Sequence, residues 1–244
     1  MKLSAIFKQT LNESDWADEH DRLTKQAIQD WCKQARIRNY SLSKDGNDYV
    51  IDANEDVRLY ANDLPLDDDN KCYLPYRFGE VNGNFIILTN NREKLASLKN
   101  GPYMVNGNYV ARHLQLETLE GGPSSVNNEF DVSNNQLKSW DGIPSQCGRL
   151  IIHHNKIPSF TGISKHWTMG SELSCDAIDR GVLELLEIEG LDDVLFRHDF
   201  GGTSAAAEVD KANRIINHHL KGDRDVFDLQ SDLLDADLGE WIKR

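Results

Sequence analysis

The amino-acid sequence predicts an α/β solenoid, in which a short β-solenoid lies between two helical regions. Two observations carry this prediction. One string of residues recurs in the middle of the chain at a nearly constant interval, and the segments on both sides lack the repeat but have helical periodicity. We therefore expect an N-terminal helical cap over residues 1–48, the solenoid over 49–167 and an α-rich acidic cap over 168–244.

The recurring string begins with valine, continues with polar residues and ends on an aromatic residue. It is VNGNF from Val81, VNGNY from Val105 and VNNEF from Val126, and a weaker copy, QCGRLI, starts at Gln146, so the spacing is 24, 21 and 20 residues. A period of this length with the pattern LxLxxN is typical of leucine-rich repeats. Separate β-hairpins also use Asn-Gly, but they do not predict the matched spacing of the later asparagine and leucine residues.

The repeat also predicts which side chains enter the core. Successive strand residues point to opposite faces, so the inward set should be Phe85, Ile87, Tyr109, Ala111, Phe130, Val132, Leu150 and Ile152. Shortly after each strand comes Asn90, Asn135 or Asn155, with Leu114 in the remaining unit. A buried asparagine at this point is expected to hydrogen-bond to backbone groups that the turn leaves unpaired.

A further unit is expected at residues 49–77, with short strands at 49–51 and 57–60. Helical patterns occupy 14–36, 207–222 and 225–244, and residues 181–196 predict a short helix, a glycine break and a strand. Residues 171–244 as a whole carry no recognisable repeat. Since terminal repeats expose apolar and hydrogen-bonding edges, the flanking helices are expected to cover the two ends of the solenoid.

The chain is strongly acidic, but its charge is unevenly distributed. Formal net charge is −13, made up of −6 over residues 1–70, +3 over 71–170 and −10 over 171–244. Acidic flanks oppose contact with a phosphate backbone, so direct nucleic-acid binding is not expected, and they favour a basic partner surface instead. No run of eighteen apolar residues and no signal-peptide pattern is present, which predicts an intracellular protein without a membrane span.

Little in the sequence indicates catalysis or metal binding. The four cysteines are widely spaced and are expected to be reduced and buried, at Cys32, Cys72, Cys147 and Cys175. No catalytic or phosphate-binding string is present, so we expect no enzyme, no catalytic residue, no metal and no cofactor. His153 and His154 should point to opposite faces of a strand, which disfavours a shared metal, and the other histidines, including the pair at 218–219, are expected on the surface.

The outward face of the predicted strands is the candidate partner-binding site. By strand register it comprises Ile86, Leu88, Val110, Arg112, Asp131, Ser133, Ile151 and His153. Four of these residues are large and apolar, and a contiguous exposed apolar patch usually marks an interaction site. The alternative is that a flanking segment folds over this face and buries it.

Several stretches together resemble a family of tailed-bacteriophage accessory proteins that contain degenerate leucine-rich repeats. They are IQDWCKQARIRNYSL, YVIDANEDVRLY, LPYRFGEVNGNF, VNNEFDVSNNQLKSWDGIP, LLEIEGLDDVLF, RIINHHL and DLQSDLLDADLGEW, and they cover nearly the whole chain. The family has no assigned chemistry, so the resemblance implies no catalytic residue. It implies a phage protein that acts in the cytoplasm of the infected bacterium. The fourth repeat lacks the glycine–proline close and Leu114 replaces an asparagine, which implies a locally irregular solenoid.

Three functions follow from these patterns. The favoured one is a non-enzymatic interaction protein that binds and inhibits a bacterial host or defence protein through the solenoid face and the acidic flanks. The second is an acidic mimic of nucleic acid that blocks a nuclease or another nucleic-acid-binding complex, and salt should weaken its binding. The third is a hydrolase whose site, near the junction of solenoid and tail, would combine His166, Cys175 and aspartates, although their spacing does not support it.

Overall fold

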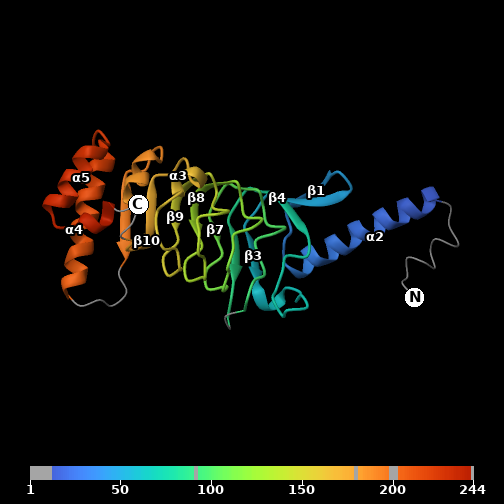
Figure 1. Ribbon diagram of the computed structural model, residues 1–244. Coiled ribbons are helices and arrows are strands. Elements are labelled where there is room, and N and C mark those ends of the chain that lie inside the picture. The colour runs from blue at the N-terminus through green and yellow to red at the C-terminus, as the bar shows by residue number, and fades with distance from the viewer. Residues whose placement is uncertain (1–12, 91–92, 179–180, 198–202, 243–244) are drawn as a thin grey trace.

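The computed structural model describes residues 13–90, 93–178, 181–197 and 203–242, and the chain forms a β-solenoid with helices at both ends (Figure 1). The expected order of helix, solenoid and helical region is therefore confirmed. The helices are α2 (Glu13–Gln34), η1 (Ala61–Asp63), α3 (Ile163–His166), η2 (Val182–Glu187), α4 (Thr203–Lys221), α5 (Val226–Asp235) and η3 (Gly239–Ile242). None of the described helices is both long and apolar enough to cross a membrane.

Each turn of the solenoid contributes two short strand segments that meet at a corner, so the strands stack in two parallel ladders. The first ladder joins β2 (Asp48–Ala53), β4 (Arg77–Val81), β6 (Met104–Val105) and the beginnings of β8 (Ser125–Asp131) and β9 (Gln146–Ile151). The second joins β3 (Val57–Tyr60), β5 (Phe85–Leu88), β7 (Tyr109–Val110), the ends of β8 and β9, β10 (Glu172–Asp176) and β11 (Asp193–Arg197). The strand β1 (Tyr40–Asp45) pairs antiparallel with β2.

The corner between the ladders explains the recurring Asn-Gly-Asn string. Asn82 donates from Nδ2 to Asn54 Oδ1 at 2.9 Å, and Asn127 donates from Nδ2 to Asn106 Oδ1 at 3.0 Å, so side-chain amides connect successive corners. A Cβ atom on Gly107 would lie 2.6 Å from the carbonyl oxygen of Gly83. Glycine is therefore required where one corner rests on the backbone of the previous one, and the string is not a hairpin turn.

The predicted inward residues form the core. All eight of them are at most 2% exposed, and the aromatic members continue a stack that begins at Phe78. Ring centroids are 5.2 Å apart between Phe78 and Phe85, 5.1 Å between Phe85 and Tyr109 and 5.3 Å between Tyr109 and Phe130. Each turn thus buries its aromatic side chain only against its neighbours, which makes the turns interdependent.

Asn135 is buried and satisfies backbone groups of two turns, as the sequence predicts. Its Oδ1 accepts from the amides of Leu114 and Leu116, both at 3.0 Å, and its Nδ2 donates to the carbonyls of Ala111 at 2.8 Å and Val132 at 2.9 Å. Asn155 repeats the arrangement in the next turn with the amide of Leu137 and the carbonyls of Val132 and Ile152. Asn90, the third member of the predicted set, is exposed.

The repeat extends further towards the C-terminus than the sequence pattern indicates. Leu150 pairs with Leu173 and Leu173 with Val194, at spacings of 23 and 21 residues, and Cys175 and Phe196 take the second inward position. The expectation that residues 171–244 carry no repeat is therefore wrong for β10 and β11. The corner before β10 lacks the Asn-Gly-Asn string, which is why pattern matching passes over it.

The helix α4 lies against the open edge of β11, the last strand of the second ladder. Asn213 and Asn217 lie one helical turn apart on α4. Asn217 accepts from the amide of Val194 at 2.7 Å and donates to its carbonyl at 2.9 Å, and Asn213 makes the same pair of bonds with Phe196 at 2.9 and 3.3 Å. These amides therefore occupy hydrogen-bonding groups that a further strand would otherwise use. The expected single helix over 225–244 is interrupted after Asp235.

At the other end, the C-terminal half of α2 lies against the first turns. Ile28 and Cys32 are buried, and the ring of Trp31 contacts Tyr76 and Phe78 edge-on at centroid distances of 5.6 and 6.0 Å. The N-terminal part of α2 extends away from the solenoid (Figure 1). All four cysteines are free and buried, as expected, and burial raises the pKa of Cys32 and of Cys72 to about 11 and that of Cys147 to about 12.

Candidate functional site

The outward positions of the second ladder line one side of the solenoid, which we call the outer face, although Asp131 and Ser174 within it are buried. Register places Arg58, Ile86, Val110, Asp131, Ile151, Ser174 and Leu195 in one column across the strands. A second column, two residues further along each strand, begins with the paired Tyr60 and Leu88 and ends with the paired Asp176 and Arg197. The strands that carry the two columns lie side by side through the body of the solenoid (Figure 1).

Six of the eight predicted partner-binding residues are at least partly accessible on this face. Arg112 is exposed, and the other five are half-buried, namely Ile86, Leu88, Val110, Ile151 and His153. Leu195 and Tyr60 add further exposed apolar surface at opposite ends, at 42% and 43% exposure. Strand alternation therefore identifies most of the outer face, although Tyr60 and Leu195 lie in turns that the prediction of the site leaves out.

Asp131 and Ser133 depart from the prediction, because they are only 4% and 2% exposed. Asp131 Oδ1 accepts from the backbone amide of Ser133 at 3.0 Å and from its hydroxyl at 2.6 Å, and its Oδ2 lies 3.6 Å from Arg112 Nη1. The expectation that these two side chains face solvent is wrong. Their short polar groups hydrogen-bond to each other beneath the surface, whereas the guanidinium group of Arg112 is exposed to solvent.

Three residues of alternating charge, Glu129, Arg149 and Glu172, form a row across the same face. The predicted site does not include them. Arg149 Nη2 lies 2.7 Å from Glu172 Oε1, and Arg149 Nη1 lies 3.8 Å from Glu129 Oε2. Burial, followed by the nearby Asp131, raises the pKa of Glu129. These residues occupy equivalent positions in three turns, so the period could have revealed the row once β10 was recognised as a repeat.

The two adjacent histidines do not lie on opposite faces as predicted. The rings of His153 and His154 meet edge-on with centroids 4.8 Å apart. The strand β9 ends at Ile151, before both histidines, and the backbone of His154 is left-handed with a φ of 58°, so strand alternation does not extend to this pair. Burial, with smaller contributions from Arg197 and His154, lowers the pKa of His153, whose ring lies at the edge of the outer face.

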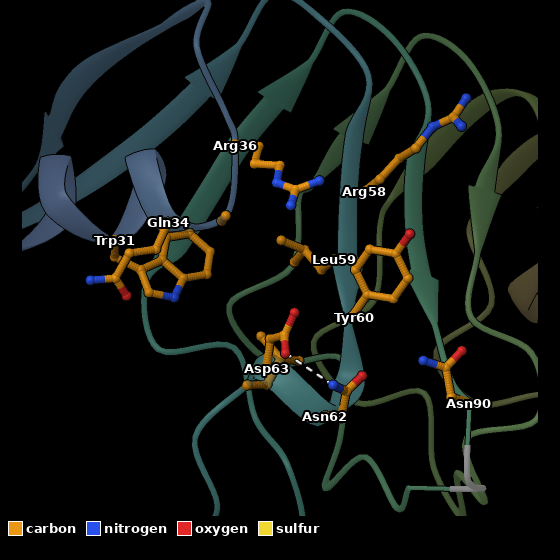
Figure 2. Close-up of a pocket in the computed structure, with 11 residues that line it drawn as sticks. Trp31, Gln34, Arg36, Arg58, Leu59, Tyr60, Asn62, Asp63 and Asn90 are labelled. Carbon is orange, nitrogen blue, oxygen red and sulfur yellow. Dashed lines mark hydrogen bonds between the residues drawn. The ribbon is translucent and has the colours of Figure 1, made fainter.

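A pocket of about 570 Å³ opens at the N-terminal end of the outer face, between the end of α2 and β3 (Figure 2). It is lined by Trp31, Gln34, Ala35, Arg36, Arg58, Leu59, Tyr60, Asn62, Asp63, Leu64 and Asn90. In Figure 2 the side chain of Arg36 points towards Leu59, the guanidinium group of Arg58 extends away from the other lining residues, and Asn62 and Asp63 lie at the opposite end. Sequence reasoning missed this pocket, because its residues come from separate elements and form no motif.

The residues of the hypothetical hydrolase site are not brought into one pocket. His166 Nε2 lies 3.2 Å from Asp141 Oδ1 at the surface, whereas Cys175 is 1% exposed and belongs to the core. His219, expected on the surface, is 6% exposed, and its Nε2 lies 2.9 Å from Asp232 Oδ2. Within the described part of the chain, no three His, Cys, Asp or Glu side chains are arranged to hold a metal ion.

Comparison of the chain with protein-family models, with curated proteins and with solved structures gave no match. The function must therefore be argued from the geometry of the outer face and the pocket.

Proposed function

We propose that the protein is a non-enzymatic interaction protein of a tailed bacteriophage, which binds and inhibits a bacterial host or defence protein through the outer face. In this proposal the repeat is of the leucine-rich type. The helical regions at the two ends act as caps that keep the solenoid from extending by edge-to-edge pairing. The site of action is the cytoplasm of the infected bacterium.

The observation that carries the proposal is the composition of the outer face. Ile86, Val110 and Ile151 lie in one column with accessible surface, and arginines and carboxylates surround them. A mixture of apolar centre and charged surroundings resembles the anatomy of protein interfaces. The described helices leave this surface open: α4 lies against β11 at the end of the ladder rather than over β5 and β7.

The partner is predicted to contact the rigid sheet directly. Because the outer face is held by two ladders and by the buried asparagines, it changes little on binding, and little ordering entropy opposes association. Charged surroundings such as Arg112 and Arg149 then set the orientation of the partner, while the apolar column provides the desolvated centre. The acidic C-terminal region increases the association rate with a basic partner.

The test is capture of the partner from bacterial lysate with the tagged full-length chain and two outer-face variants, Ile86→Glu and Val110→Glu. Both positions are half-buried, so a carboxylate can reach solvent without entering the core. Phe227→Glu is the matched control, because Phe227 is 79% exposed on α5, away from the ladders. The proposal expects one stoichiometric partner that the control retains and both outer-face variants lose.

Salt dependence separates the proposal from the nucleic-acid mimic. Raising the salt from about 50 mM to about 500 mM shortens the screening length to a few ångströms and weakens contacts between exposed charges. A partner that survives high salt and is lost with Val110→Glu supports the outer face. A partner that is released by salt and is insensitive to Val110→Glu supports mimicry by the acidic flanks and contradicts the proposal.

A further inference from the structure

Among the described residues, three of the four ladder ends are hydrogen-bonded to another part of the chain, and the fourth, at β3, is open. The strand β1 pairs with β2, and the asparagines of α4 bond to β11. At the last bridge of the first ladder, Arg224 donates from Nη1 to the carbonyl of Ile188 at 2.6 Å. The strand β3 pairs with β5 alone, and its other side borders the pocket of about 570 Å³ at the end of α2.

The register of the second ladder shows which backbone groups of β3 face the pocket. The amide of Val57 donates to the carbonyl of Asn84 at 2.7 Å, so the backbone groups of Val57, and of Leu59 two residues later, are directed towards β5. The intervening N–H and C=O of Arg58 and the N–H of Tyr60 therefore point to the opposite side. Among the described residues, none of these groups has a hydrogen-bond partner, which is the arrangement of an edge strand that can accept a further strand.

We propose that an extended, acidic peptide segment of the partner binds in this pocket, where it adds a strand to the open side of β3 and places a carboxylate against Arg36. Peptide recognition by strand addition obtains affinity from main-chain hydrogen bonds and specificity from nearby side chains. The strand β3 comprises 4 residues, Val57–Tyr60, so the added stretch is of similar length. The inference rests on the proposed function, because the added strand extends the outer face, of which Arg58 and Tyr60 are the first members.

Arg36 favours a segment that carries a carboxylate. In Figure 2 its side chain points from the end of α2 towards Leu59, across the space beside β3. No described residue forms a hydrogen bond or ion pair with this guanidinium group, and its five N–H donors suit the two oxygens of a carboxylate. The solenoid uses the same pair between its own turns, where Arg149 lies 2.7 Å from Glu172 on the adjacent strand. A cation at the end of α2 also offsets the helix dipole, but that role does not require a side chain directed at β3.

The walls of the pocket suit a single extended chain. The helix η1 lies at one end with Asn62 and Asp63, and α2 faces β3 from the other side. An added strand lies about 4.8 Å from its neighbour, in the space between these elements, whereas the edge of a second solenoid would meet α2 first. Asp63 repels a second carboxylate at its end of the pocket, which directs the acidic residue of the segment towards Arg36.

The experiment is an NMR titration of the isotope-labelled full-length chain with the synthetic peptide Thr-Val-Glu-Val-Thr, whose β-branched residues favour an extended backbone. We expect the amide resonances of Arg58 and Tyr60 to shift on binding, and those of Val57 and Leu59 to shift less, because their amides remain bonded to β5. Replacing the glutamate of the peptide with glutamine should weaken binding by about tenfold, and Arg36→Gln should weaken binding of the glutamate peptide by about the same factor. The two peptides should bind equally to Arg36→Gln, since the carboxylate then has no guanidinium to engage.

Two peptides methylated on alternate backbone nitrogens test strand addition itself. One carries the methyl groups on both valines and the other on the glutamate and the last threonine, so one of the two loses the amides that face β3 and the other keeps them. Equal binding of both, or no binding of the parent peptide, would overturn the inference. Arg38→Gln is the matched control, since Arg38 is exposed two residues further along and does not line the pocket; a loss of binding there as large as in Arg36→Gln would overturn the role of Arg36.

Capture of the partner from lysate distinguishes failure of this inference from failure of the proposed function. A partner that is lost with Val110→Glu but fully retained by Arg36→Gln would support the outer face and contradict the added strand. Peptide binding by a chain that captures no partner would support the open edge of β3 and contradict the proposed function.

Discussion

Replacing Asn135 by alanine tests how the solenoid satisfies its buried backbone. The side chain is 2% exposed and bonds to the amides of Leu114 and Leu116 and to the carbonyls of Ala111 and Val132. Alanine leaves these two amides and two carbonyls without side-chain partners inside the solenoid. An unsatisfied buried polar group costs about 1–3 kcal/mol. Because water entering the vacated space recovers part of that loss, we expect the free energy of unfolding to fall by about 3–5 kcal/mol.

Alanine substitution of the two related asparagines, Asn155 and Asn90, provides free energies of unfolding with which the loss at Asn135 can be compared. Asn155 is half-buried and makes fewer such bonds, so Asn155→Ala should cost about 2–3 kcal/mol. Asn90 is exposed, and Asn90→Ala should cost less than about 0.5 kcal/mol. Urea unfolding followed by circular dichroism measures all three. Equal losses at the three positions, or a loss below about 1 kcal/mol at Asn135, would refute the reasoning.

Four further predictions concern the corners, the C-terminal end and the pH dependence. Gly107→Ala should lower the free energy of unfolding by at least about 1–3 kcal/mol in urea, because its Cβ would lie 2.6 Å from a backbone oxygen; an unchanged midpoint would contradict this. Asn217→Ala should increase self-association in analytical ultracentrifugation, since it frees backbone groups of Val194 at the edge of β11; a distribution of species equal to that of the wild type would contradict it. Arg224→Ala should lower the thermal midpoint by several degrees, because the guanidinium donates to the carbonyls of Leu186, Leu191, Ile188 and Leu220. Arg214, which is exposed on α4, provides the control, and a midpoint equal to that of Arg214→Ala would refute that role. Burial lowers the pKa of His153, so the unfolded state binds the proton more readily and wild-type stability should fall as the pH drops below about 6.5; His153→Gln should reduce that slope, and an identical slope would exclude this ring as its source.

The inward positions could be predicted because repetition provides several copies of the same evidence. Phe85, Tyr109 and Phe130 each follow an asparagine-rich corner at a matched distance, and stacking requires equivalent residues in equivalent places. The role of Asn135 followed from the same logic, because a bend buried between turns needs a side chain that both donates and accepts.

Other features depend on contacts between segments that sequence spacing does not connect. The burial of Asp131 depends on bonds to Ser133 and on the cover provided by neighbouring turns, not on alternation. The contact of His153 with His154 depends on the end of β9 at Ile151 and on the left-handed backbone of His154. The pocket arises where α2 meets β3, and neither segment has a pattern that indicates its partner.

The most direct test of the central claim is site-specific photocrosslinking of the outer face inside bacteria. Benzoylphenylalanine replaces Val110 on the outer face in one version of the chain and Phe227 on α5 in another, and adducts are detected after irradiation. We predict a single abundant adduct from position 110, which is lost when Ile86→Glu is added, and none from position 227. An adduct from position 227 in the absence of one from position 110 would contradict the claim that the outer face binds the partner.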